Sequence, residues 1–312
     1  MNLSAHKLTC ILSVLSCVML LTAFFLLLPS AASAGEDPEV LLRQGMAAVD
    51  AMDYGTAFDL FSRAAETGNA EAQYDVGTCY ASGKGVEQSD EKAAEWFRLS
   101  ADQGFASALC ALGRFYYYGH AVEQSYETAA EYFFAAAEQH DTLALFCLGK
   151  AFQEGQGVVK SPEEAAAYYK AAADAGYALA QHNLGICYEE GSGVEQSWTM
   201  AVYYYSLAAN QGVAGAQVRL GNCYRAGHGL SQSYAMALEF YRVAAAQGDP
   251  YALYNLGLSC ENGEGVEKNL KDAAWYYLKA YMKGYAPGLE AYFRLRINGL
   301  EGFDLKTYTP EN

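Results

Sequence analysis

The chain has 312 residues and a formal net charge of −16 at pH 7, from 20 basic and 36 acidic side chains. Proteins that bind nucleic acid neutralise its phosphates with Lys and Arg, so this balance argues against nucleic acid and against anionic membrane surfaces as partners. It fits a protein whose partner is a neutral or basic polypeptide.

The N-terminus has the pattern of a secretory signal, which we place at residues 1–34. Lys7 supplies a positive charge, residues 8–28 are almost all apolar, and Ala-Ser-Ala at 32–34 forms a small-residue cleavage site. The apolar run is also long enough to span a bilayer, so an uncleaved membrane anchor is the alternative. After cleavage, no other segment is apolar enough to insert into a membrane. We expect the mature chain outside the cytosol, in the periplasm if the source is bacterial.

A glycine then recurs every 36 residues. An alanine precedes each glycine by five positions and Leu or Val precedes it by one, while an aromatic residue follows three positions later in five of the six repeats. These offsets lie on one face of an α-helix, so each repeat is predicted to begin with a helix, called here the A helix. The recurring glycines are Gly77, Gly113, Gly149, Gly185, Gly221 and Gly257.

A Gly-x-Gly loop follows each A helix, with Gly119-His120-Ala121 as the exception, and a Ser or Asn stands four residues after the loop. Ser and Asn at an N-cap stabilise a helix by roughly 1 kcal/mol relative to Ala, so a second helix, the B helix, is predicted to start there. It carries two neighbouring aromatic residues and ends at a glycine, replaced once by His140. A nucleotide-binding loop would follow a β-strand and occur once; these loops are predicted to be turns between helices.

The pattern A-x-A-[Q/L]-x-x-L-G-x-x-Y-x-x-G-x-G-V…A-x-x-[W/Y]-[F/Y]-x-x-A-A-x-x-G resembles the Sel1-like repeats, relatives of the tetratricopeptide repeats, in six full repeats over residues 70–285. The resemblance implies an all-α fold, an α/α solenoid in which helix-turn-helix repeats stack into a right-handed superhelix of about 15 helices. It also implies that A helices line the concave side and B helices the convex side. Ser or Asn replaces the Asp that the family often has at the B-helix N-cap, which preserves the capping chemistry.

Shorter segments flank the six repeats. Residues 35–69 resemble a tetratricopeptide repeat and are predicted to cap the N-terminal end. Residues 286–312 contain one more helix and a polar tail, and are predicted to cap the C-terminal end. A solenoid needs such caps because its outer repeats have no neighbour to cover them.

No strong catalytic or metal-binding pattern is present. Ser89 and Lys92 match the S-x-x-K nucleophile motif of penicillin-recognising enzymes, but Ser89 is a predicted N-cap and the partner motifs S-D-N and K-T-G are missing. The five histidines are scattered, and no Cys/His pair has metal-ligand spacing. We therefore expect no enzyme activity, no metal and no cofactor.

The six cysteines after the signal are predicted to be free and mostly buried. A cysteine-rich branch of Sel1-like proteins, linked to β-lactam binding or hydrolysis, has a disulfide within each repeat, but no full repeat here holds two cysteines. Equivalent cysteines of adjacent repeats, such as Cys187 and Cys223, would lie on helices roughly 8–10 Å apart. A disulfide needs Cα atoms within about 7 Å.

Each A helix leaves a second stripe of residues at six and three positions before its glycine and at one and four positions after it. Related repeats contact ligands with this stripe, and here its composition differs from repeat to repeat, as in a recognition surface. Its basic residues are suited to pair with carboxylates of a bound chain; the alternative is that they are solvated or pair with Glu189 and Glu261. The predicted partner-binding residues are Tyr74, Arg114, Tyr117, Phe146, Lys150, His182, Arg225 and Tyr254.

The sequence thus predicts an exported, non-enzymatic scaffold that binds a protein or peptide partner through its concave face, in a regulatory or envelope-related role. Two alternatives remain at this point. One is a β-lactamase-like hydrolase of the cysteine-rich Sel1-like branch, and the other is a membrane-anchored structural repeat protein. The sequence assigns no oligomeric state.

Overall fold

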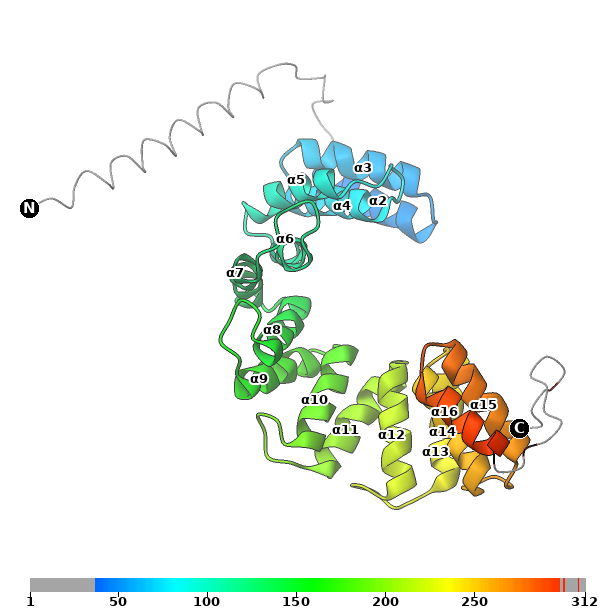
Figure 1. The fold of residues 1–312 in the computed structure, drawn as a ribbon. Helices are drawn as coiled ribbons and strands as arrows, with labels where there is room; N and C mark the ends of the chain where they lie inside the picture. Colours follow the sequence, from blue (N-terminus) through cyan, green and yellow to red (C-terminus); the bar gives the residue numbers. More distant parts are fainter. Residues whose placement is uncertain (1–36, 298–299, 301–307, 309–312) are drawn as a thin grey trace, which may run out of the picture. The chain divides into compact units, whose positions relative to one another are not determined.

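The computed structural model describes residues 37–297 together with Leu300 and Tyr308. These residues form 15 α-helices and no strand, which confirms the all-α fold (Figure 1). The chain divides into two compact units after Gln103. The first unit contains helices α2 to α5 and the second contains α6 to α16. The predicted signal at residues 1–34 lies outside the described residues.

The A helices begin and end where the spacing of the glycines predicts. Those of the full repeats are each 13 residues long, and a left-handed glycine ends each of them, such as Gly191 with φ of 70°. Their bounds are α4 (Ala70–Ser82), α6 (Ala106–Tyr118), α8 (Thr142–Glu154), α10 (Ala178–Glu190), α12 (Ala214–Ala226) and α14 (Pro250–Asn262), and the helices of the same type at the two ends are α2 (Pro38–Asp50) and α16 (Pro287–Ile297).

The B helices start at the predicted N-caps. The side chain of Ser197, for example, accepts a hydrogen bond from the backbone N–H of Met200, and the other five predicted caps act in the same way. Ser89 is one of these caps and accepts a hydrogen bond from the backbone N–H of Lys92. The S-x-x-K match is therefore explained by helix capping. The B helices are α3 (Tyr54–Glu66), α5 (Asp90–Ala101), α7 (Tyr126–Ala137), α9 (Pro162–Asp174), α11 (Trp198–Asn210), α13 (Tyr234–Ala246) and α15 (Leu270–Met282).

Within a repeat, the A-helix glycine lies against the second aromatic residue of the B-helix pair. A Cβ added to Gly185 would lie 2.5 Å from the ring of Tyr205, which is fully buried. The first aromatic residue of the pair stacks on the A helix instead, as Tyr204 does on Tyr188 with ring centroids 5.6 Å apart. The tyrosine pairs are therefore packing residues, as predicted, and both contacts recur in other repeats of the second unit.

The Gly-x-Gly loop of each repeat lies against the preceding repeat. A Cβ on Gly193 would lie 2.0 Å from the carbonyl oxygen of Pro162, at the start of the preceding B helix. Gly157 approaches the carbonyl oxygen of Tyr126 in the same way. The second glycine therefore permits backbone-to-backbone contact between repeats, and the loop is a turn, as predicted. At the one exception, Ala121 adopts the left-handed conformation with φ of 54°.

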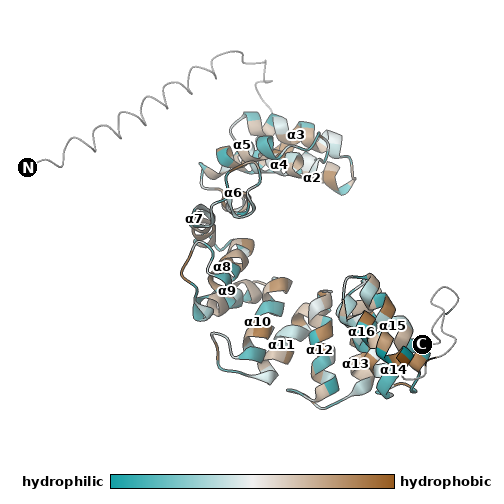
Figure 2. Ribbon diagram, viewed as in Figure 1, coloured by the Kyte–Doolittle hydropathy of each residue, from teal (hydrophilic) through white to brown (hydrophobic). Residues whose placement is uncertain are grey.

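The C-terminal residues that the structure describes contact the last repeat. Leu300 is buried in the same apolar cluster as Tyr277 and Leu295, and the Tyr308 hydroxyl donates a hydrogen bond to the buried carboxylate of Asp272 at 2.6 Å. Each helix carries both hydrophilic and apolar residues (Figure 2). Over the described residues, no helix combines the length and apolarity that a bilayer crossing requires.

Candidate functional site

Part of the predicted stripe serves the fold. In three repeats, the residue four positions after the A-helix glycine accepts a hydrogen bond from a buried tyrosine hydroxyl of the B helix. Gln153 accepts from Tyr169 at 2.5 Å, and Glu261 accepts from Tyr277 at 2.6 Å. Because an unpaired buried hydroxyl would cost about 1–3 kcal/mol, these polar side chains are structural.

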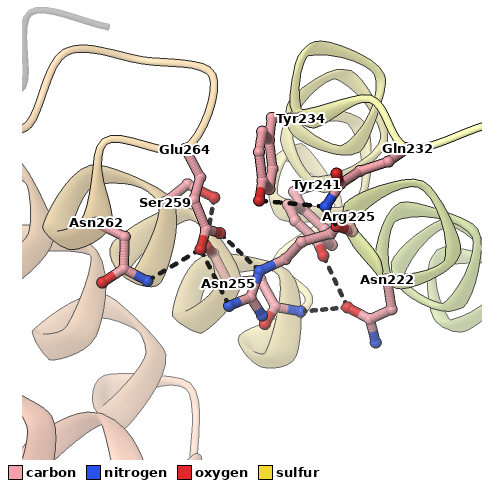
Figure 3. Close-up of polar contacts among 9 residues, drawn as sticks. All are labelled: Asn222, Arg225, Gln232, Tyr234, Tyr241, Asn255, Ser259, Asn262 and Glu264. Carbon is pink, nitrogen blue, oxygen red and sulfur yellow. Dashed lines mark hydrogen bonds and ion pairs between the residues drawn. The ribbon is translucent and has the colours of Figure 1, made fainter. Parts of the chain in front are cut away.

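Arg225 lies in a polar cavity of about 540 Å³ on the A-helix face of the second unit. Its Nε donates to an Oε atom of Glu264 at 2.7 Å, from the loop of the next repeat (Figure 3). This ion pair raises the pKa of the guanidinium. Beside it, the Asn222 side-chain oxygen accepts hydrogen bonds from the Tyr241 hydroxyl and from Asn255. The predicted cation is thus neutralised within the protein.

Two further arginines pair with the acidic residues of the stripe. Arg219 donates to Glu189 at 2.9 Å, and Arg294 forms an ion pair with Glu261. The two carboxylates that could have paired with the stripe cations are therefore occupied by arginines from outside the stripe. This leaves Arg114 and Lys150 as the other predicted basic residues.

Arg114 and Lys150 occupy equivalent positions on α6 and α8 and line one cavity of about 260 Å³. Two other predicted residues, Tyr117 and Phe146, line the same cavity. We call it the cationic pocket; its lining consists of Arg114, Tyr117, Tyr118, Phe133, Leu143, Phe146, Cys147, Lys150 and Tyr177.

The cationic pocket differs from its neighbours in charge. Its lining contains no Asp or Glu, whereas three further cavities of the second unit each include at least one. Lys150 Nζ lies 5.8 Å from the centroid of the Tyr117 ring. No ion pair within the described residues involves Arg114 or Lys150. The Tyr117 hydroxyl donates a hydrogen bond to Oε2 of Glu154 at 3.0 Å, so this donor is already used within the protein.

His182 and Tyr254 line a different cavity, of about 490 Å³, together with Arg219 and Asn255. Burial lowers the pKa of His182 to about 4, and the nearby Arg219 acts in the same direction. The imidazole is therefore neutral near pH 7. Its Nδ1 is buried and has no hydrogen-bond partner in the described structure.

Tyr74 is the one predicted site residue in the first unit, where its ring contacts Phe97 at a centroid distance of 5.6 Å. Its neighbour Asp75 is half-buried, and burial followed by repulsion from Glu71 raises the pKa of its carboxyl to about 7. Each unit thus has its own candidate residues, and those of the second unit divide between three cavities.

The position two residues before the A-helix glycine was not predicted to line a site. It carries Cys147 in the cationic pocket and Arg219 and Asn255 in the polar cavities. Tyr177 was also missed; it precedes α10 and its ring lies 5.0 Å from that of Phe146. A stripe one position wider would have included the first three.

No group of three or more His, Cys, Asp or Glu residues in the described part of the chain is placed to hold a metal ion. The arrangement suits binding: cations, aromatic rings and hydrogen-bonding side chains lie along one face of the A helices.

The repeats match a known protein family. A family model described as the Sel1 repeat matches seven consecutive segments, 40–69, 70–105, 106–141, 142–177, 178–213, 214–249 and 250–285. The chain belongs to the Sel1 repeat family. The resemblance noted in the sequence is confirmed, and the match also includes the shorter segment before residue 70.

Two solved structures of bacterial proteins are similar to this Sel1 repeat protein. A Sel1 repeat protein from Oxalobacter formigenes is 31% identical, with a TM-score of 0.69, and the match covers 77% of this chain and 96% of that one. A protective antigen of uropathogenic Escherichia coli with an SLR fold is 29% identical, with a TM-score of 0.73; the match covers 86% of this chain but 58% of the antigen. No curated protein matches the chain. Sel1 repeats generally mediate protein–protein interaction, and proteins built from them are generally non-catalytic.

Proposed function

We propose that this Sel1 repeat protein is an exported, non-enzymatic scaffold whose cationic pocket binds a polypeptide segment. The segment presents a carboxylate beside an apolar or aromatic side chain. The observation that carries the proposal is the pair of cations, Arg114 and Lys150, in an apolar cavity without any acidic lining residue. In a chain with a net charge of −16, such a local excess of positive charge is suited to one specific anionic group.

The lining of the cationic pocket suits a side chain of a bound polypeptide. Phe146, Leu143 and Tyr177 supply apolar and aromatic surface of the kind that dominates binding energy at protein interfaces. Arg114 supplies a planar guanidinium that can donate two hydrogen bonds to one carboxylate.

The rest of the partner should be neutral or basic. The acidic protein repels a strongly acidic polypeptide at long range, whereas the pocket attracts a carboxylate at short range. Export is part of the same proposal, and its support is the signal pattern at residues 1–34. The regulatory or envelope-related role that we infer follows from that location.

The test is affinity capture from an envelope extract with three versions of the protein. The pocket variant carries Arg114→Glu and Lys150→Glu. The control carries Lys170→Glu and Arg242→Glu, which make the same change in net charge at exposed ion pairs of the B helices α9 and α13. Circular dichroism melting checks that all three versions fold.

We expect wild type and control to capture the same polypeptide and the pocket variant to retain at most a tenth of it, because like charges across an interface cost several kcal/mol. Equal capture by the pocket variant would place recognition elsewhere on the protein. The N-terminal residue of the protein recovered from cells should be Gly35. An N-terminus at Met1 in the membrane fraction would instead support the anchored form.

A further inference from the structure

Three tyrosine rings gather at the last full repeat. Tyr251 and Tyr254 lie on α14, and Tyr285 lies between α15 and α16. The ring centroid of Tyr285 is 4.7 Å from that of Tyr251 and 5.1 Å from that of Tyr254, with interplanar angles of 55° and 73°. All three residues line the cavity of about 490 Å³ that His182 also lines. We call these three residues the tyrosine cluster.

The tyrosine cluster uses the same repeat positions as the aromatic wall of the cationic pocket. Tyr254 and Tyr285 correspond to Phe146 and Tyr177, which stand three 36-residue repeats earlier in the chain. The ring centroids of Phe146 and Tyr177 are 5.0 Å apart, so the two contacts are alike. The second unit therefore builds this aromatic wall twice.

The charged residues beside the two walls differ. The cationic pocket has Arg114 and Lys150 in its lining. The equivalent positions of the later repeats carry Asn222 and Leu258, which have no charge. The cavity of the tyrosine cluster is lined by the carboxylate of Asp249 instead. The same wall is thus combined with cations at one place and with an anion at the other.

Asp249 is the charge of this cavity that has no countercharge within residues 37–297. Its Oδ1 accepts a hydrogen bond from the backbone N–H of Ala252 at 2.9 Å, and no ion pair in that range involves its carboxylate. Arg219, the basic residue of the lining, is paired with Glu189 at 2.9 Å. Lys283 comes close to the residue before Asp249 but is not part of the lining.

Aromatic rings and a carboxylate that line one cavity suit a cation. The face of a tyrosine ring attracts a cation within about 6 Å of its centroid, and rings at steep angles to one another surround a compact cation better than they support the flat face of a sugar. A guanidinium is planar, stacks on aromatic rings and donates hydrogen bonds to carboxylates. Tyr251 is 55% exposed, so part of its ring is open to a ligand.

We propose that the tyrosine cluster and Asp249 bind an arginine side chain of the polypeptide partner. The guanidinium lies against the tyrosine rings and donates to Oδ2 of Asp249. That the ligand is part of a polypeptide rests on the proposed function, whereas the preference for a cation rests on this cavity alone. Two sites built on the same repeat positions then select opposite charges, which sets the direction in which the partner lies along the A helices.

The test uses two tripeptides, acetyl-Ala-Arg-Ala-amide and the same peptide with citrulline, the neutral isostere of arginine. Each is titrated into the full chain carrying isotope-labelled tyrosine, and NMR follows the ring signals. We expect the arginine peptide to shift the signals of the tyrosine cluster saturably, to leave those of Tyr188 unchanged, and to bind roughly fivefold tighter or more than the citrulline peptide.

Two variants separate the charge from the rings. Asp249→Asn removes the charge but keeps a residue that caps helices well, and it should weaken binding of the arginine peptide roughly threefold or more. Asp141→Asn makes the same change at the equivalent N-cap of α8 and should bind as wild type does. Tyr251→Leu, which removes an exposed ring, should weaken the arginine peptide but not change the melting curve measured by circular dichroism.

The wild-type titration can overturn the proposal without any variant. Equal affinity for the arginine and citrulline peptides would do so, as would the absence of a saturable shift up to a peptide concentration on the order of 10 mM. A saturable shift with N-acetylglucosamine and none with the arginine peptide would assign the cavity to a carbohydrate. Because the titration involves no captured polypeptide, its failure is distinct from a failure of the cationic pocket in the capture experiment.

Discussion

His182 shows how the environment of one side chain sets its response to pH. Burial and Arg219 lower the pKa of its imidazole to about 4, against an ordinary value of 6.5. The unfolded chain therefore binds a proton more readily than the folded chain between these two values. Protonation of His182 therefore does not affect the free energy of unfolding above pH 6.5, and it lowers this free energy as the pH falls towards 4.

Replacing His182 by Phe should remove this component of the pH dependence. We expect wild type to lose up to about 3 kcal/mol more stability than His182→Phe between pH 7 and pH 4.5, less any screening by solvent in the open cavity. Urea unfolding at the two pH values measures this difference. The control, His228→Phe, changes an exposed histidine, and its curve should follow wild type. Parallel curves for wild type and His182→Phe would show that burial does not control this group.

The ion pairs of single residues could not be predicted from the sequence. The sequence predicted that Arg114, Lys150 and Arg225 belong to the A-helix stripe, but it could not tell which of these cations is neutralised by a carboxylate. Glu264, which pairs with Arg225, lies 39 residues further along the chain, in the loop of the next repeat. Such a pairing depends on how repeats stack, and the pattern within one repeat does not contain that information.

Helices, in contrast, follow from local signals. An N-cap such as Ser161 and a left-handed glycine such as Gly155 fix where a helix begins or ends through groups a few residues away. The 36-residue period repeats these signals along the chain, so the sequence alone predicted nearly every helix.

The A-helix glycines give a prediction at the scale of the helix pair. Alanine favours a helix over glycine by about 1 kcal/mol, but a Cβ on Gly185 would lie 2.5 Å from the ring of Tyr205. Overpacking a core usually costs about 1–3 kcal/mol, so Gly185→Ala should lower the melting temperature, as measured by circular dichroism. Gly55→Ala is the matched control, because its nearest neighbour would be 3.8 Å away; it should be neutral or stabilising. Equal effects of the two substitutions would contradict the packing argument.

The whole chain is a repeat array in which stability depends on each repeat and its neighbours. The array also divides into two compact units after Gln103. The apolar cluster of the first unit involves residues 41–96, and the clusters of the second unit involve residues 109–300. Each of these clusters lies within a single unit.

We therefore expect the two units to unfold in separate transitions, each of which can be shifted by its own substitution. Asp75→Asn reports on the first unit. The folded-state pKa of Asp75 is raised to about 7 from an ordinary 3.8. Below pH 3.8 the carboxyl is protonated in both states and does not oppose folding; as the pH rises from 3.8 to above 7, its ionisation increasingly lowers the free energy of unfolding. At pH 8 the neutral Asn should stabilise the first unit, by about 1–2 kcal/mol after allowance for partial exposure.

Hydrogen exchange followed by mass spectrometry assigns each transition to its peptides along a urea series. At pH 8, Asp75→Asn should delay exchange in α2 to α5 and leave α8 to α15 unchanged, whereas Gly185→Ala should hasten exchange around α10 and α11 and leave α2 to α5 unchanged. Asp59→Asn, which removes the same charge from an exposed site of α3, is the control for net charge. If both substitutions move exchange throughout the chain by the same amount, the protein unfolds as one cooperative array, because nearest-neighbour coupling then extends through the boundary at Gln103.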